Sequence, residues 1–75
     1  MVLSSCKKSE KCIIKSLNFK DKKLQLHLAE IGFFVGNHIE VLKFSSLKKT
    51  MLIKVLNSCF AIKTVMADNI EVENE

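Results

Sequence analysis

The stretch LAEIGFFVGNHIEVL, residues 28–42, contains both glycines of the 75-residue chain and joins two different apolar patterns. Before Gly32 the apolar residues recur every three or four positions, which is typical of a helix that packs along one side. After Gly36 they alternate with polar residues, which is typical of a strand. Glycine tolerates the positive φ that a helix end or a tight turn requires. The stretch therefore predicts a helix that ends at Gly32 and a strand that begins after Gly36.

The helix predicted before this junction is short. Leu24, Leu28 and Ile31 recur at i, i+4 and i+7 and form a single apolar stripe. Asp21 is a suitable N-cap for a helix that begins at Lys22, because its carboxylate can accept hydrogen bonds from the free backbone N–H groups of the first turn. We therefore expect a helix of about three turns.

The other apolar segments alternate with polar residues at a period of two, the pattern of half-buried strands. We expect one strand before the helix and four after it, with a single helical turn before the last strand. A tight hairpin through Asn57 and Ser58 should join the third and fourth strands. Five short strands with tight connections favour a mainly β fold, a small barrel with one short α-helix after the first strand. The expected strands cover residues 11–19, 38–44, 51–56, 59–63 and 69–73.

The chain length indicates one domain near the lower limit for an independent core. We expect residues 1–10, which show no apolar period, to form a flexible leader, and residues 11–75 to form the single domain. So small a core leaves little room for a deep pocket, which argues against an enzyme. The sequence shows neither a Cys–His pairing nor a phosphate-binding glycine loop, the features that would indicate catalysis. We therefore assign no catalytic residue.

The charge pattern argues against a sequence-specific nucleic-acid-binding protein. The net charge is +4 at pH 7, and all 12 basic residues are lysine. The planar arginine side chain, which reads guanine edges and binds phosphates in pairs, is absent. We therefore interpret the lysines, which are enriched over residues 1–23, as a solvated surface.

The three cysteines and two histidines show no metal-binding spacing. Cys6, Cys12 and Cys59 form no C-x-x-C motif, and His27 and His38 form no H-x-x-x-H motif. We predict no metal site and no cofactor, and we expect Cys59 to be a buried apolar residue. The odd number of cysteines without a pairing pattern indicates a reducing compartment.

The chain also lacks the usual sequence signals for a membrane or an export route. No apolar run reaches the roughly 18 residues needed to cross a bilayer. The first ten residues contain too short an apolar run for a secretory signal. We therefore expect a cytoplasmic protein that does not insert into the membrane.

Three consecutive apolar residues, Phe33, Phe34 and Val35, lie between the two glycines. In a loop, such a run either closes one end of a barrel or forms an exposed apolar patch. We expect at least one of the phenylalanines to pack into the core, because so small a core needs its aromatic side chains.

Two segments resemble FeoA, a family of small cytosolic accessory proteins of bacterial ferrous iron transport. Residues 28–41, Leu-x-x-Ile-Gly-x-x-Val-Gly-x-x-Ile-x-Val, resemble the helix-to-strand signature of that family. Residues 61–73, with Ala-Ile-Lys, an alanine and Ile-x-Val-Glu, are similar to its C-terminal segment. Val35 stands where the family usually has proline, and Lys63 stands where it has arginine.

The resemblance implies an SH3-like five-stranded barrel with a helix inserted after the first strand. It also implies a partner, the membrane ferrous iron permease, which carries a cytosolic GTP-binding domain, and a role in modulating that permease. No nucleic acid is implied as a partner, and the chain could form a homo-oligomer. We place the partner-binding surface on the helix, the loop between the glycines and the end of the fourth strand. Its expected residues are Lys23, His27, Glu30, Phe33, Phe34, Val35 and Lys63.

Three other functions stay open at this stage. Similar SH3-like domains form regulatory modules at the C-termini of iron-dependent repressors, although we expect no DNA-binding helices before this domain. A small nucleic-acid-binding barrel would use the N-terminal lysines and stacked phenylalanines. A metal-sensing module would use His27, His38 or the cysteines.

Overall fold

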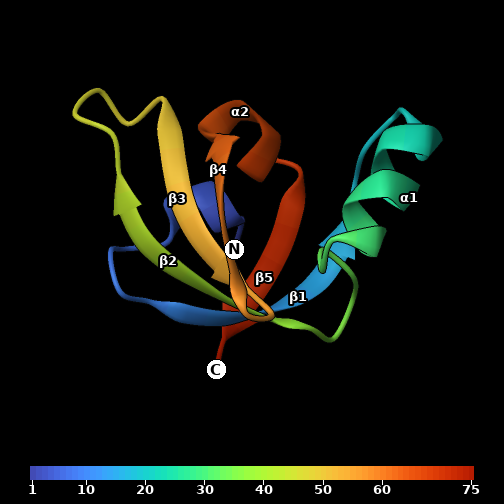
Figure 1. Cartoon of the computed structure of the whole chain (residues 1–75), viewed down its shortest axis with the longest axis horizontal. Coiled ribbons are helices and arrows are strands. Elements are labelled where there is room, and N and C mark those ends of the chain that lie inside the picture. Colours follow the sequence, from blue (N-terminus) through green and yellow to red (C-terminus); the bar gives the residue numbers. More distant parts are fainter.

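The computed structural model describes residues 1–75, and its main element is one five-stranded antiparallel sheet (Figure 1). Short helical segments lie before the first strand, between the first and second strands, and between the fourth and fifth strands. The elements are η1 (Leu3–Ser5), β1 (Lys11–Leu17), α1 (Lys22–Glu30), β2 (His38–Phe44), β3 (Thr50–Val55), β4 (Ser58–Lys63), α2 (Thr64–Ala67) and β5 (Ile70–Asn74). The strand order is β4-β3-β2-β1-β5, so β4 and β5 form the two edges.

Two irregularities bend the sheet around its core. The register shifts between Ile14 and Ser16 in β1, and between Val41 and Lys43 in β2. Such bulges bend a strand and increase its twist. The mainly β architecture and the single helix after the first strand are as predicted.

The inward face of the sheet supplies most of the core. In β3, Met51, Ile53 and Val55 are buried, and Lys54 between the last two is exposed, which confirms the predicted alternation. One cluster contains all 16 buried hydrophobic residues, and no polar or charged side chain is buried. Hydrophobic burial, worth about 1.5–3 kcal/mol for each large side chain, is therefore the main source of stability.

Helix α1 begins where the sequence predicts and packs with the predicted face. The Asp21 carboxylate accepts hydrogen bonds from the backbone N–H groups of Lys23 at 3.0 Å and Leu24 at 3.2 Å. Leu28 is buried, and Leu24 and Ile31 pack against the core in partly buried positions. None of the helices in the structure has both the length and the apolar character required to cross a membrane.

Both glycines adopt positive φ, as predicted. Gly32 has φ 119°, and the next N–H, of Phe33, donates to the Leu28 carbonyl at 2.9 Å and closes the helix end. Gly36 has φ 92°, and its N–H donates to the Ile14 carbonyl at 2.8 Å. The loop between the glycines is therefore attached to α1 at one end and to β1 at the other.

The hairpin between β3 and β4 turns one residue earlier than predicted. Val55 and Ser58 pair directly, so the turn residues are Leu56 and Asn57. Leu56 has φ 56°, which is uncommon for leucine. The buried alternation that ends at Val55 decides this register, because a slip of one residue would turn the apolar face outward.

Cys59 is exposed, and the prediction of a buried apolar role for it is wrong. In β4 the side chains that pack toward the core are Ile62, which is buried, and Phe60, which is partly buried. Because side chains alternate along a strand, Cys59 faces outward.

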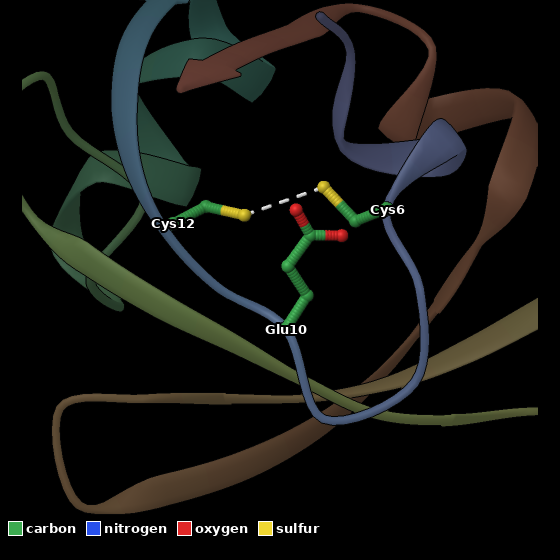
Figure 2. Close-up of side chains that lie close together, drawn as sticks. All are labelled: Cys6, Glu10 and Cys12. Carbon is green, nitrogen blue, oxygen red and sulfur yellow. Dashed lines mark hydrogen bonds between the residues drawn. The ribbon is translucent and has the colours of Figure 1, made fainter. Parts of the chain in front are cut away.

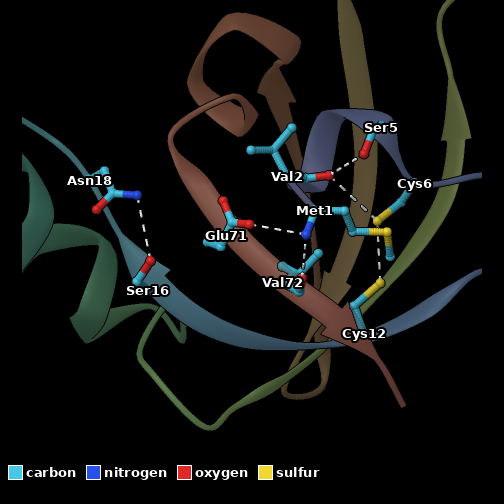
Figure 3. A network of polar contacts seen from close by, with 9 residues as sticks. All are labelled: Met1, Val2, Ser5, Cys6, Cys12, Ser16, Asn18, Glu71 and Val72. Atoms are coloured by element: carbon cyan, nitrogen blue, oxygen red, sulfur yellow. Dashed lines mark hydrogen bonds and ion pairs between the residues drawn. The ribbon is translucent and has the colours of Figure 1, made fainter.

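Residues 1–10 pack against the sheet, which differs from the flexible leader expected from the sequence. Leu3 in η1 is fully buried, and Cys6 is 3% exposed. Val2 forms an isolated β-bridge with Glu71, and Figure 3 shows this segment beside β5. The apolar residues of the segment follow neither the helical nor the strand period, so only their contacts with the core reveal their position.

Candidate docking surface and cysteine cluster

The outer side of α1 and the following loop carry exposed apolar side chains. Leu26 is 64% exposed, because it lies on the side of α1 away from the buried Leu28. Phe34 and Val35 are 43% and 61% exposed in the loop. These three side chains, together with Leu17, Lys22, Gln25 and Ala29, line one open surface hollow. The sequence analysis missed Leu26, although an apolar residue outside the stripe of an amphipathic helix is a usable signal.

Polar residues of α1 surround this apolar group. Lys23 and Glu30 lie three residues before and four residues after Leu26, so they are its neighbours on the helix surface. His27 lies four residues after Lys23, and all three polar side chains are exposed, in agreement with their predicted positions. We call this set the docking surface. It consists of Lys23, Leu26, His27, Glu30, Phe34 and Val35.

Two residues of the predicted surface lie elsewhere. Phe33 is 0% exposed, and its ring packs against Phe60 with the ring centroids 6.3 Å apart. This confirms that at least one phenylalanine of the loop belongs to the core. Lys63 is exposed at the end of β4 next to α2, and Figure 1 shows that end of β4 apart from α1.

The structure also brings together three side chains that the sequence analysis treated separately. Cys6, Glu10 and Cys12 have ligand atoms within 4.8 Å of one another (Figure 2), and the two sulfur atoms are 3.3 Å apart. Burial, with a contribution from the hydrogen bond to Cys12, raises the pKa of the Cys6 thiol to about 12. Burial also raises the pKa of the Cys12 thiol. Both thiols are therefore neutral near pH 7, and we call the three residues the cysteine cluster.

The arrangement of the side chains gives little support to a nucleic-acid-binding barrel or to a metal site that uses the two histidines. Of the five phenylalanines only Phe34 is exposed, whereas single-stranded nucleic acid needs several exposed rings on which to stack. His27 and His38 are not part of the cysteine cluster. The Nδ1 atom of His38 instead contacts the Glu75 carboxylate.

Comparisons with known proteins agree with this fold. Residues 1–74 match the family described as FeoA domain. The solution structure of iron(II) transport protein A from Clostridium thermocellum has 30% sequence identity and a TM-score of 0.89, over 99% of this chain and 45% of that one. The crystal structure of Stenotrophomonas maltophilia FeoA, complexed with zinc and described as a prokaryotic SH3 domain protein, has 20% identity and a TM-score of 0.82. That match covers 97% of this chain and 89% of the other.

The same fold occurs in a larger regulatory protein. A manganese-dependent transcriptional repressor in complex with manganese has 14% identity and a TM-score of 0.87, over 100% of this chain and 36% of that one. This likeness shows the fold alone. A search of curated proteins finds no match to the sequence. The fold is SH3-like, and the match over residues 1–74 shows that the chain belongs to the FeoA family of ferrous iron transport accessory proteins.

Proposed function

We propose that this protein acts in the cytoplasm, where it binds the ferrous iron permease through the docking surface and modulates transport without catalysing a reaction. The observation that carries the proposal is the group of three exposed apolar side chains, Leu26, Phe34 and Val35, around one hollow. Exposed apolar side chains that gather in one place mark a site of interaction with another protein. Membership of the FeoA family of ferrous iron transport accessory proteins supports the choice of the permease as the partner.

The composition of the docking surface fits a reversible complex. Its apolar centre would be desolvated on binding, and an apolar centre with a polar rim is the usual anatomy of such interfaces. Lys23 and Glu30 carry opposite charges beside Leu26. Charged residues at the rim mainly set orientation and association rate, so the affinity should depend chiefly on the apolar centre.

The test compares two substitutions of exposed apolar residues. Phe34→Ala should weaken binding to the detergent-solubilised, full-length permease by roughly tenfold or more, because truncation of a central aromatic side chain typically has this effect. The same change should lower the free energy of unfolding by only about 1 kcal/mol, because the ring is partly exposed. Leu47→Ala is the matched control, since Leu47 is 75% exposed in the loop between β2 and β3.

The outcomes separate the site from the function. If both variants bind the permease as tightly as the wild type does, the docking surface is wrong, although the function can still stand. If the wild-type chain does not co-purify with the permease, the proposed function itself is contradicted.

A further inference from the structure

We propose that Cys6, Glu10 and Cys12 form a binding site for a thiophilic divalent metal ion, with Zn²⁺ as the best-matched ion. The proposal rests on the cysteine cluster alone and does not use any residue of the docking surface. The docking surface is exposed, whereas the ligand atoms of the cysteine cluster are mostly buried between the N-terminal segment and β1.

The spacing of the ligand atoms fits one shared ion. The Sγ atoms of Cys6 and Cys12 are 3.3 Å apart. Two sulfur ligands of a tetrahedral Zn²⁺ ion lie roughly 3.8 Å apart, as follows from Zn–S bonds of about 2.3 Å. The two thiolates therefore need to move apart by only a few tenths of an ångström to accept the ion. Figure 2 shows the Glu10 carboxylate extending toward the two sulfur atoms, where it can complete a set of three protein ligands.

Backbone hydrogen bonds hold the segment that carries these ligands. The Lys7 N–H donates to the Glu10 Oε1 atom at 2.7 Å, and the Glu10 N–H donates to the Lys7 carbonyl at 3.1 Å. The turn is also bonded to β2, because the Val41 N–H donates to the Glu10 carbonyl at 2.9 Å. One carboxylate oxygen of Glu10 remains for a metal. A turn that is already ordered reduces the entropy that an ion must overcome on binding.

The chemistry of the ligands selects the class of metal. Thiolates favour Zn²⁺ and Cu(I), whereas carboxylate and carbonyl oxygens alone would favour Mg²⁺ or Ca²⁺. When Zn²⁺ binds, each of the two S–H groups loses its proton to the solvent as an S–Zn bond forms. Three protein ligands leave the fourth tetrahedral position open to water. Two thiolates and one carboxylate leave the bound ion with one excess negative charge, and the exposed Lys7 and Lys8 lie in the same turn.

A surface hollow lies beside Cys6. Cys6 lines it together with residues of the N-terminal segment and with Phe44, Lys48 and Thr64. Glu10 lines a second hollow on the N-terminal segment, so the cluster lies just beneath the surface and only a local opening of residues 1–10 is needed to admit an ion. Once bound, it would join the N-terminal segment, which lies against β5, to the start of β1. The expected consequence is a more stable attachment of residues 1–10.

The experiment titrates the full-length, tag-free, chelator-treated protein with Co²⁺ and then with Zn²⁺ under anaerobic conditions. We expect one Co²⁺ per chain with thiolate-to-cobalt charge-transfer absorption, and its displacement by Zn²⁺. Cys59→Ser should behave as the wild type does, because Cys59 is exposed and outside the cluster. Cys12→Ala should abolish the charge-transfer band, and Glu10→Gln should weaken Zn²⁺ binding by roughly tenfold or more.

A stability measurement keeps the proposal testable if a cysteine variant folds poorly. Zn²⁺ at about 100 times its Kd should raise the Tm of the wild type and of Cys59→Ser on the order of 10 °C. Glu10→Gln, whose side chain is only partly buried, should keep the fold and show a smaller rise. Absence of a stoichiometric cobalt complex in the wild type would overturn the proposal. A complex that Cys59→Ser loses, or that a folded Cys12→Ala variant retains, would overturn it as well.

Discussion

Gly32 and Gly36 share a positive φ but have different surroundings. A Cβ atom on Gly32 would lie 2.9 Å from the Val55 Cγ2 atom, whereas a Cβ atom on Gly36 would meet nothing within 4 Å. Gly32 therefore serves two purposes, the left-handed backbone and the close approach of α1's end to the β3–β4 hairpin. Gly36 serves only the first of them.

This difference predicts unequal effects of two alanine substitutions. Gly36→Ala should lower the free energy of unfolding by about 1 kcal/mol through backbone strain alone. Gly32→Ala adds a steric clash with Val55 and should cost roughly 3 kcal/mol. Urea denaturation of both variants checks the difference, and equal losses would contradict the role of the close approach.

At the scale of elements, α1 and the N-terminal segment depend on different kinds of contact. Helix α1 has nine residues, which is too short for stability in isolation, so its cap and its packed stripe must hold it. The N-terminal segment contains one 3-10 turn and depends on the burial of Leu3 and Cys6. Each element can therefore be tested by a single substitution.

For α1 the informative residue is Asp21. Asp21→Ala removes the acceptor of two backbone N–H groups and should cost about 1 kcal/mol of stability. Asp21→Asn should recover most of that loss, because asparagine is an equally good N-cap. Thermal unfolding followed by circular dichroism checks this order, and an asparagine variant as unstable as the alanine variant would show that the cap is not responsible.

For the N-terminal segment the informative residue is Leu3. Leu3→Ala should lower the free energy of unfolding by roughly 2–5 kcal/mol, because it leaves a cavity at a fully buried position. Leu47→Ala, at a highly exposed position, should change it by only about 0.5 kcal/mol. A Leu3→Ala variant as stable as the control would restore the earlier expectation of a leader that contributes nothing to the fold.

At the scale of the whole molecule, the three cysteines divide into one exposed thiol and two buried thiols. Cys59 is on the outward face of an edge strand, while Cys6 and Cys12 join the core on the inner face of the sheet. Their access to solvent differs for that reason, and burial also raises the pKa of Cys6 and of Cys12. Burial raises the pKa of Cys6 to about 12, so its reactive thiolate form is scarce near pH 7.

The thiols should therefore react at very different rates in the metal-free, reduced protein. We expect iodoacetamide to modify Cys59 first, with Cys6 and Cys12 at least roughly 100-fold slower, because they need an opening of the structure. Mass spectrometry of peptides from a time course gives the three rates. Urea above the unfolding midpoint should remove the difference, and equal rates in the native protein would contradict the buried pair.

Much of the fold could be read from local spacing. The stripe of Leu24, Leu28 and Ile31, the Asp21 cap and the two glycines predict α1 and its end correctly. These features depend on residues a few positions apart, whose geometry the backbone period determines. The sequence predicts the hairpin turn at Asn57 and Ser58, one residue later than the structure has it. The buried register of β3 outweighs the local preference for asparagine and serine in the turn.

The sequence by itself determined the number, the order and the approximate bounds of the strands and of helix α1, and its two family-like segments indicated the FeoA fold. Only the tertiary structure decided that Leu26, Phe34 and Val35 share one surface, that Phe33 is buried, and that residues 1–10 join the core. It also placed Cys6 against Cys12 across a turn. The physical reason is that periodicity records which side of an element is apolar, whereas the partner of each side depends on long-range contacts such as that between Val2 and Glu71.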